Sequence, residues 1–136
     1  MARLASQASA GFYPTPPRVV TAIARHLAAT AERAGPPPGR RGGRTIRLLD
    51  PCAGTGEAAA AIAASLGAES FGIELNEQRA EACRARLDRV LATSAFSVRL
   101  ANGAFSCLWL NGPYDYDDEQ RRTEHAFLVR HVQSKS

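Results

Sequence analysis

Short apolar runs alternate with helical patterns along most of the chain, and this alternation constrains the fold more than any other feature of the sequence. Strands are expected at 45–49, 71–75, 96–100 and 105–110, and helices before Gly35 and at 57–66, 77–91 and 119–132. Strands that alternate with helices form right-handed crossover units in a parallel sheet. The sequence therefore predicts an α/β fold with about four strands, parallel in the first half, and flanking helices.

The length of 136 residues allows one domain. We expect 1–11 to be a disordered N-terminus and 12–136 to form the domain. The link 101–104 is too short for a helix, so the third and fourth expected strands either form a hairpin or are joined across the edge of the sheet.

The net charge is +4, and the cationic residues are arginines apart from Lys135. Five of them lie around the turn-rich segment 36–43: Arg33, Arg40, Arg41, Arg44 and Arg47. This cluster is either a phosphate-binding surface for nucleic acid, DNA above all, or a solvated loop. The three cysteines lack metal-ligand spacing, which predicts reduced thiols and no metal site. No run has the length of a signal peptide core or a membrane span, so a cytoplasmic protein without membrane contact is expected.

Three polar residues lie at the carboxyl ends of expected strands: Asp50, Glu74 and Asn111. In parallel sheets the ligand binds at the carboxyl ends of the strands, so these side chains are predicted to converge on one edge.

The first of these residues opens a glycine loop that predicts a cofactor site. Gly54 and Gly56 allow a tight turn, and the helix that follows favours electron-rich groups at its amino end. Glu74 stands where a carboxylate would accept hydrogen bonds from ribose hydroxyls, which S-adenosylmethionine and NAD both present. Asp50-Pro51 favours the methyl donor, because an NAD-binding loop usually has glycine at the positions of Pro51 and Cys52. Asp50 could hold the methionine ammonium group, directly or through water.

The segment Asn111-Gly112-Pro113-Tyr114 suits the methylation of an exocyclic amine. The amine of adenine is a poor nucleophile because its lone pair is delocalised into the ring. The Asn111 side-chain oxygen and the main-chain carbonyl of the next residue would accept its hydrogens, and Tyr114 would stack on a base swung out of its helix. A hairpin at Asn111-Gly112 is the alternative, although Pro113 would remove a ladder donor.

Together these motifs resemble the Asn-Pro-Pro-Tyr type of S-adenosylmethionine-dependent DNA adenine methyltransferase, and most of all uncharacterised bacterial and phage methyltransferase-like proteins. The resemblance implies a Rossmann-like class I methyltransferase fold, with an N-terminal Tyr-Pro-Thr-Pro segment over the methionine end of the cofactor. It assigns catalysis to Asn111, Gly112, Pro113 and Tyr114. It assigns S-adenosylmethionine binding to Tyr13, Thr15, Asp50, Pro51, Cys52, Ala53, Gly54, Gly56, Glu74, Leu75 and Asn102.

The chain departs from this family in three ways. Gly112 replaces a proline, Asn102 is the nearest candidate for the acid that contacts the cofactor adenine, and four strands are expected where the family has seven. The predicted function is methylation of the adenine amino group in nucleic acid, DNA in preference to RNA. The alternative is a non-catalytic cofactor-binding or structural subunit, with a protein partner or a second copy covering the open edge of the sheet. An NAD-dependent oxidoreductase is a third reading of the glycine loop.

Overall fold

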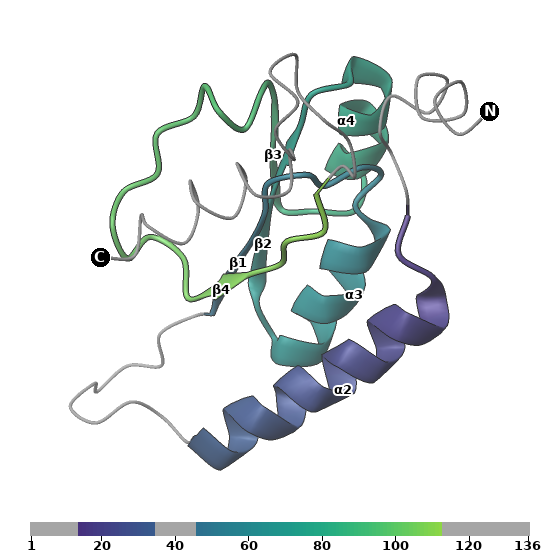
Figure 1. Ribbon diagram of the computed structural model, residues 1–136, viewed down its shortest axis with the longest axis vertical. Coiled ribbons are helices and arrows are strands. Elements are labelled where there is room, and N and C mark those ends of the chain that lie inside the picture. Colours follow the sequence, from purple (N-terminus) through teal and green to yellow (C-terminus); the bar gives the residue numbers. More distant parts are fainter. Residues whose placement is uncertain (1–13, 35–45, 113–136) are drawn as a thin grey trace, which may run out of the picture.

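The computed structural model describes residues 14–34 and 46–112, and these form one sheet with helices packed beside it (Figure 1). The elements are α2 (Pro17–Ala34), β1 (Arg47–Asp50), α3 (Glu57–Leu66), β2 (Glu69–Glu74), α4 (Glu77–Arg84), β3 (Arg89–Ala92) and β4 (Cys107–Leu108). No helix in these two ranges is long and apolar enough to cross a membrane.

All four strands are parallel and lie in the order β3-β2-β1-β4. The chain first moves outward from β1 through β2 to β3, and it then returns to place β4 on the other side of β1. The strand order therefore reverses between β1 and β4, and ligands of doubly wound sheets bind at such a reversal, beyond the carboxyl ends of the strands. The predicted α/β fold with a parallel sheet is confirmed.

Successive residues of β1 point to opposite faces of the sheet and enter two separate cores. On one face, Leu48 is fully buried against α3, whose small side chains let the helix approach the sheet closely. Helix α2 packs over α3 through Val20 and Ala24. On the other face, Leu49 packs with Ile73 beneath the segment 93–106, which arches over the sheet in green in Figure 1.

Arg47 fastens this segment to the sheet. Its guanidinium carbon lies 4.6 Å from the ring centroid of Phe71 and 5.3 Å from that of Phe105, and Nη1 donates a hydrogen bond of 3.0 Å to the carbonyl of Ala104. An ion pair of 3.6 Å with Glu69 adds to these contacts. Arg47 was predicted to belong to the basic cluster, but its side chain is engaged with the protein. Arg40, Arg41 and Arg44 lie outside the described residues.

Two expected elements are wrong. The helix predicted at 77–91 ends at Arg84, and its last apolar residues belong to β3, which pairs with β2 in the register Gly72↔Val90 and Glu74↔Ala92. The strand predicted at 96–100 is absent, because these residues form a turn and an extended segment that covers the second core. The hairpin between the third and fourth strands is also excluded, since β4 pairs with β1 in parallel. The last expected helix, 119–132, lies outside the described residues.

Candidate functional site

The loop between β1 and α3 is built around buried backbone. The Asp50 side chain is 3 % exposed, and its Oδ1 accepts a hydrogen bond of 3.0 Å from the Cys52 amide, which closes the first turn. Gly54 and Gly56 both have positive φ, of 58° and 84°. A Cβ on Gly56 would lie 2.9 Å from the Cys83 sulfur, so the loop can sit against α4 only with glycine at that position. Gly56 also precedes α3 without a capping side chain, which leaves the amide end of the helix at the edge of the loop.

Glu74, at the end of β2, ties this loop to α4. Its Oε2 accepts a hydrogen bond of 2.8 Å from the Gly54 amide. Its Oε1 accepts from the Asn76 amide at 2.8 Å and from the Arg79 Nε and Nη2 at 3.1 and 2.9 Å. Four N–H groups therefore surround a carboxylate that is 6 % exposed. The sequence predicted Glu74 as a ribose acceptor, and in the structure its acceptor positions are engaged by the protein itself.

Two buried carboxylates thus lie at the ends of adjacent strands. Burial raises the pKa of Asp50 to about 7, the Cys52 amide opposes that rise, and the negative charge of Glu74 adds to it. The site therefore favours a cation beside Asp50, because a positive charge would stabilise the ionised carboxylate. Burial also raises the pKa of the Cys52 thiol well above its usual range, so this thiol stays protonated. Within residues 14–34 and 46–112, no group of three His, Cys, Asp or Glu side chains is placed to hold a metal ion.

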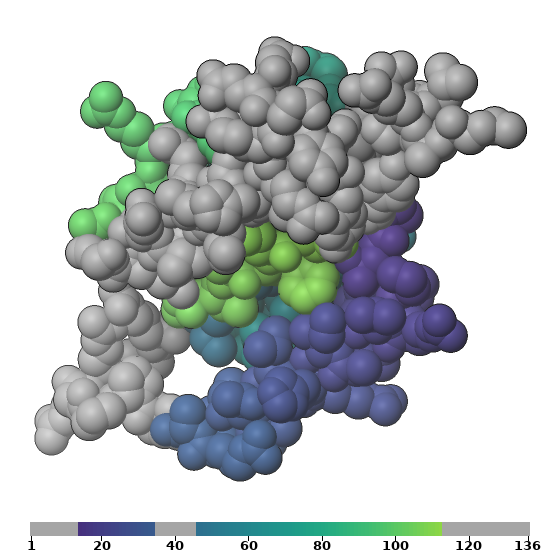
Figure 2. Space-filling view, viewed as in Figure 1, coloured from purple at the N-terminus to yellow at the C-terminus, as the bar shows by residue number. Residues whose placement is uncertain are grey.

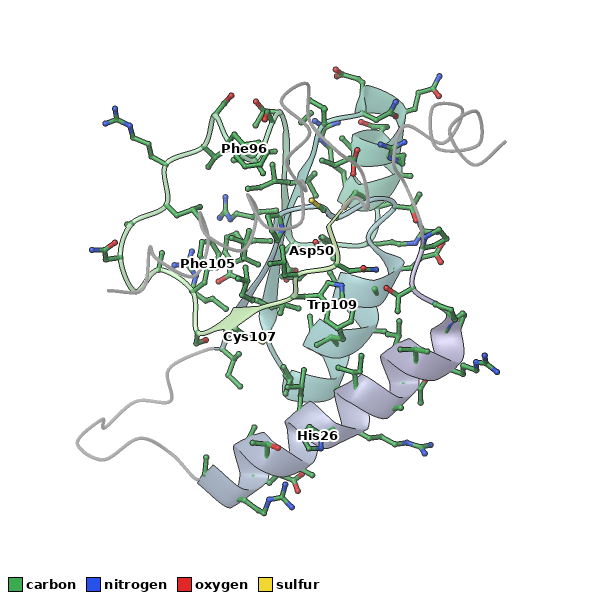
Figure 3. The ribbon with its side chains drawn as sticks, in the orientation of Figure 1. His26, Asp50, Phe96, Phe105, Cys107 and Trp109 are labelled. Atoms are coloured by element: carbon green, nitrogen blue, oxygen red, sulfur yellow. The ribbon has the colours of Figure 1, made fainter. Side chains whose placement is uncertain are left out.

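Asn111 reaches the same edge of the sheet from β4. The Trp109 amide donates a hydrogen bond of 2.9 Å to the Leu49 carbonyl, so the chain after β4 runs alongside the end of β1. Figure 3 shows Asp50 and Trp109 together near the start of α3, whereas His26 lies apart from them on α2. The Asn111 Nδ2 donates a hydrogen bond of 2.7 Å to Oγ1 of Thr15. Asp50 ends β1, Glu74 ends β2 and Asn111 follows β4, and the carboxyl ends of these parallel strands share one edge, as the sequence predicted.

The other predicted site residues are distributed unevenly. Pro51, Ala53 and Gly54 are buried in the loop, and Gly112 is half-buried beside Asn111. Leu75 follows Glu74 with 74 % of its surface exposed. Tyr13, Pro113 and Tyr114 lie outside the described residues, so the hairpin alternative for the tetrad cannot be followed beyond Gly112.

Asn102 is exposed in a turn before β4. Asn102 follows the strand expected at 96–100, whereas the third strand of the structure, β3, ends at Ala92. The residue that follows this strand is Thr93, whose amide donates a hydrogen bond of 3.0 Å to the Glu74 carbonyl. A cofactor role for Asn102 stays a prediction that has lost its original basis.

Sequence reasoning missed Arg79 and Trp109 as parts of the site. Arg79 stands five residues after Glu74, in the first turn of α4. Its ion pair with Glu74 follows from the Asn76 cap, whose Oδ1 accepts from the Arg79 amide at 3.0 Å and so sets the start of the helix. An Asn-Glu-x-Arg sequence one residue after a strand-ending acid is the signal that could have revealed this contact.

The reversed parallel sheet, the glycine loop after β1 and the acid at the end of β2 define a Rossmann-like fold. The chain belongs to an uncharacterised methyltransferase family (DUF6094), whose model matches residues 1–134. This membership confirms the prediction of a methyltransferase and agrees with S-adenosylmethionine as the predicted cofactor. The narrower assignment to adenine in DNA stays a prediction.

Among solved structures, an RNA methyltransferase from Salinibacter ruber in complex with S-adenosyl-L-homocysteine is similar, with 21% sequence identity and a TM-score of 0.46. The likeness covers 63% of this chain and 53% of that one, so the chain spans about half the length of the solved protein. No curated protein matches the chain.

Proposed function

We propose that this protein transfers a methyl group from S-adenosylmethionine to the exocyclic amino group of adenine in nucleic acid, DNA in preference to RNA. The observation that carries the proposal is the shared edge of the sheet, where the glycine loop with Asp50 and Glu74 stands beside the segment that holds Asn111. Membership in a methyltransferase family supports the class of reaction.

The chemistry of this edge fits the cofactor, which supplies an electrophilic methyl group on a sulfonium centre. The buried Asp50 carboxylate would hold the positive ammonium group, since a bound cation compensates the cost of its burial. The backbone of Gly54 and Gly56 would lie against the cofactor without a Cβ between them. The exposed side chain of Leu75 offers an apolar surface for the adenine ring beside Glu74.

Glu74 would accept hydrogen bonds from the ribose hydroxyls. Because its carboxylate oxygens already accept hydrogen bonds from the protein, one of these donors would have to leave. The amides of Gly54 and Asn76 are held in place by the loop and the helix cap, but Arg79 reaches Oε1 through a long side chain. Ribose hydroxyls would therefore take the place of the Arg79 guanidinium on Oε1. The Arg79 side chain is 19% exposed, so its guanidinium can turn toward solvent.

Asn111 and the Gly112 carbonyl would orient the amine. Acceptors that grip the two amine hydrogens draw the nitrogen lone pair out of conjugation with the ring, and their hydrogen bonds strengthen as positive charge develops on the nitrogen. No general base with a shifted pKa is needed for this step, because the proton becomes acidic once the methyl group has been transferred. Tyr114 would stack on the flipped base.

The proposal is tested by transfer of a radiolabelled methyl group from S-adenosylmethionine to duplex DNA, single-stranded DNA and RNA, followed by identification of the methylated nucleoside. We expect N6-methyladenine, at higher yield in DNA. Asn111→Ala should abolish transfer while S-adenosylhomocysteine binds within about twofold of its affinity for the wild type, because the substitution removes an amine acceptor and no cofactor contact. Gln78→Ala is the matched control, since it removes an exposed side-chain amide from α4. Equal activity in Asn111→Ala would contradict the role assigned to Asn111.

A second function is favoured by the sheet itself. In the described part of the chain, β4 is a two-residue strand at the edge of the sheet and pairs only with β1. An open edge can accept a strand from another chain. The protein would then be a cofactor-binding subunit completed by a partner or a second copy. Binding of S-adenosylhomocysteine, with no methyl transfer to any nucleic acid and a dimer in light scattering, would favour this function over the first.

A further inference from the structure

The side chains of Thr15 and Asn111 are joined across 96 residues of sequence. The hydrogen bond from Nδ2 to Oγ1 is 2.7 Å long, and both residues are half-buried. In Figure 2 the yellow-green atoms at the end of the described chain lie directly against the purple atoms at the start of α2. A contact of this length between two uncharged side chains is a well-formed hydrogen bond.

Thr15 is held on a stiff support. It precedes Pro16 and Pro17, and a residue before proline is restricted to extended backbone conformations. The amides of Val19 and Val20 donate to the Pro16 carbonyl at 2.9 and 3.2 Å, so the helix begins at Pro17, two residues after Thr15. Val20 is 5% exposed in the core, which anchors this first turn to the rest of the fold.

Asn111 lies three residues beyond the end of β4 and two residues beyond Trp109, whose amide donates to the Leu49 carbonyl of β1. It also precedes Gly112, where the Asn-Pro-Pro-Tyr pattern that the sequence resembles has proline. The terminal torsion of an asparagine side chain is broad, so backbone placement alone does not decide where its oxygen points.

We infer that Thr15 is a positioning residue for the proposed methyl transfer. Its hydroxyl oxygen accepts the Asn111 Nδ2, which turns the amide so that Oδ1 faces away from Thr15 and toward the incoming amine. This inference rests on the proposed function. The sequence assigned Thr15 to the cofactor, whereas the hydrogen bond directs its hydroxyl to Asn111, the residue proposed to grip the substrate.

The experiment compares Thr15→Val, which keeps the shape and removes the hydroxyl, with Thr15→Ser, which keeps the hydroxyl. Thr15→Val should lower kcat about 10- to 100-fold, because a loosened acceptor loses part of its alignment. The affinity for S-adenosylhomocysteine should stay within about twofold, because the hydroxyl acts on Asn111. Thr15→Ser should retain kcat within about threefold. Thr21→Val is the matched control, since its exposed hydroxyl donates to the Pro17 carbonyl of its own helix at 3.0 Å.

Each outcome decides the inference separately from the proposed function. A wild type active on DNA with an equally active Thr15→Val variant would overturn the positioning role and leave the proposed function standing. A Thr15→Val variant whose loss is wholly in cofactor affinity would make Thr15 a cofactor ligand and overturn it as well.

If the wild type transfers no methyl group, NMR of the Asn111 side-chain amide tests the contact with Thr15 instead. Its NH₂ resonances, assigned by their disappearance in Asn111→Ala, should shift and exchange faster with solvent in Thr15→Val, and should be preserved in Thr15→Ser. Resonances that are unchanged in Thr15→Val would refute the contact.

Discussion

Alanine at Gly56 should destabilise the protein far more than alanine at Gly67, although the two glycines flank the same helix. Gly56 is the N-cap of α3 and Gly67 its C-cap, and their φ values are 84° and 60°. A side chain in left-handed backbone costs about 1–2 kcal/mol at either position. At Gly67 a Cβ would meet nothing within 4 Å. We therefore expect Gly67→Ala to lower the free energy of unfolding by about 1 kcal/mol.

At Gly56 the same Cβ would lie 2.9 Å from the Cys83 sulfur and 3.3 Å from Cγ of Leu87. Cys83 is 0% exposed and Leu87 is 6% exposed, so neither can move into solvent. Overpacking of this kind costs about 1–3 kcal/mol. Added to the backbone cost, the loss for Gly56→Ala should be about 2–5 kcal/mol.

Urea unfolding followed by circular dichroism measures both losses, and thermal melts should separate the two variants by about 5–10 °C. In a Gly56→Ala background, Cys83→Ala should recover part of the loss, because it removes the closest atom. Equal losses for Gly56→Ala and Gly67→Ala would refute the claim that α4 confines the glycine loop.

Three further predictions concern the carboxylates and the apolar residues of the site. The folded-state pKa of Asp50 is raised from 3.8 to about 7. The wild type should therefore lose stability relative to Asp50→Asn as the pH rises from about 4 to about 7, by up to about 4 kcal/mol. If the two proteins differ in stability by the same amount at pH 4 and at pH 8 in urea unfolding, this prediction is wrong. Glu74→Gln places an amide NH₂ group beside the four N–H donors that surround this side chain, and it should lower the free energy of unfolding in urea by about 2–4 kcal/mol. Glu81→Gln changes a surface ion pair with Arg84 and should lower it by less than about 0.5 kcal/mol. Leu75→Ala should leave the melting temperature within about 2 °C of the wild type and weaken S-adenosylhomocysteine binding about 3- to 30-fold in calorimetry, because the exposed side chain is proposed to cover adenine; unchanged affinity would exclude that role.

Local patterns in the sequence were sufficient to predict the elements whose ends are marked by particular residues, such as glycine or proline. The helix predicted at 57–66 has the observed bounds of α3, because Gly56 and Gly67 mark its two ends. The start of α2 follows from its prolines, and β1 and β2 lie within two residues of their predicted positions. The alternation of these elements was enough to predict a parallel sheet and a ligand edge at Asp50 and Glu74, since both lie at the carboxyl ends of strands.

Long-range pairing decided the rest. The residues 89–92 continue the apolar pattern of α4, and only hydrogen bonding to β2 makes them a strand. The residues 96–100 have the composition of a strand, but β4 occupies the place beside β1, and this segment covers the second core instead. The contacts of Glu74 with Arg79 and of Thr15 with Asn111 likewise depend on where whole elements come to rest. Sequence periodicity reports which residues share a face of one helix or strand, whereas the partners of that face are chosen by the packing of the whole chain.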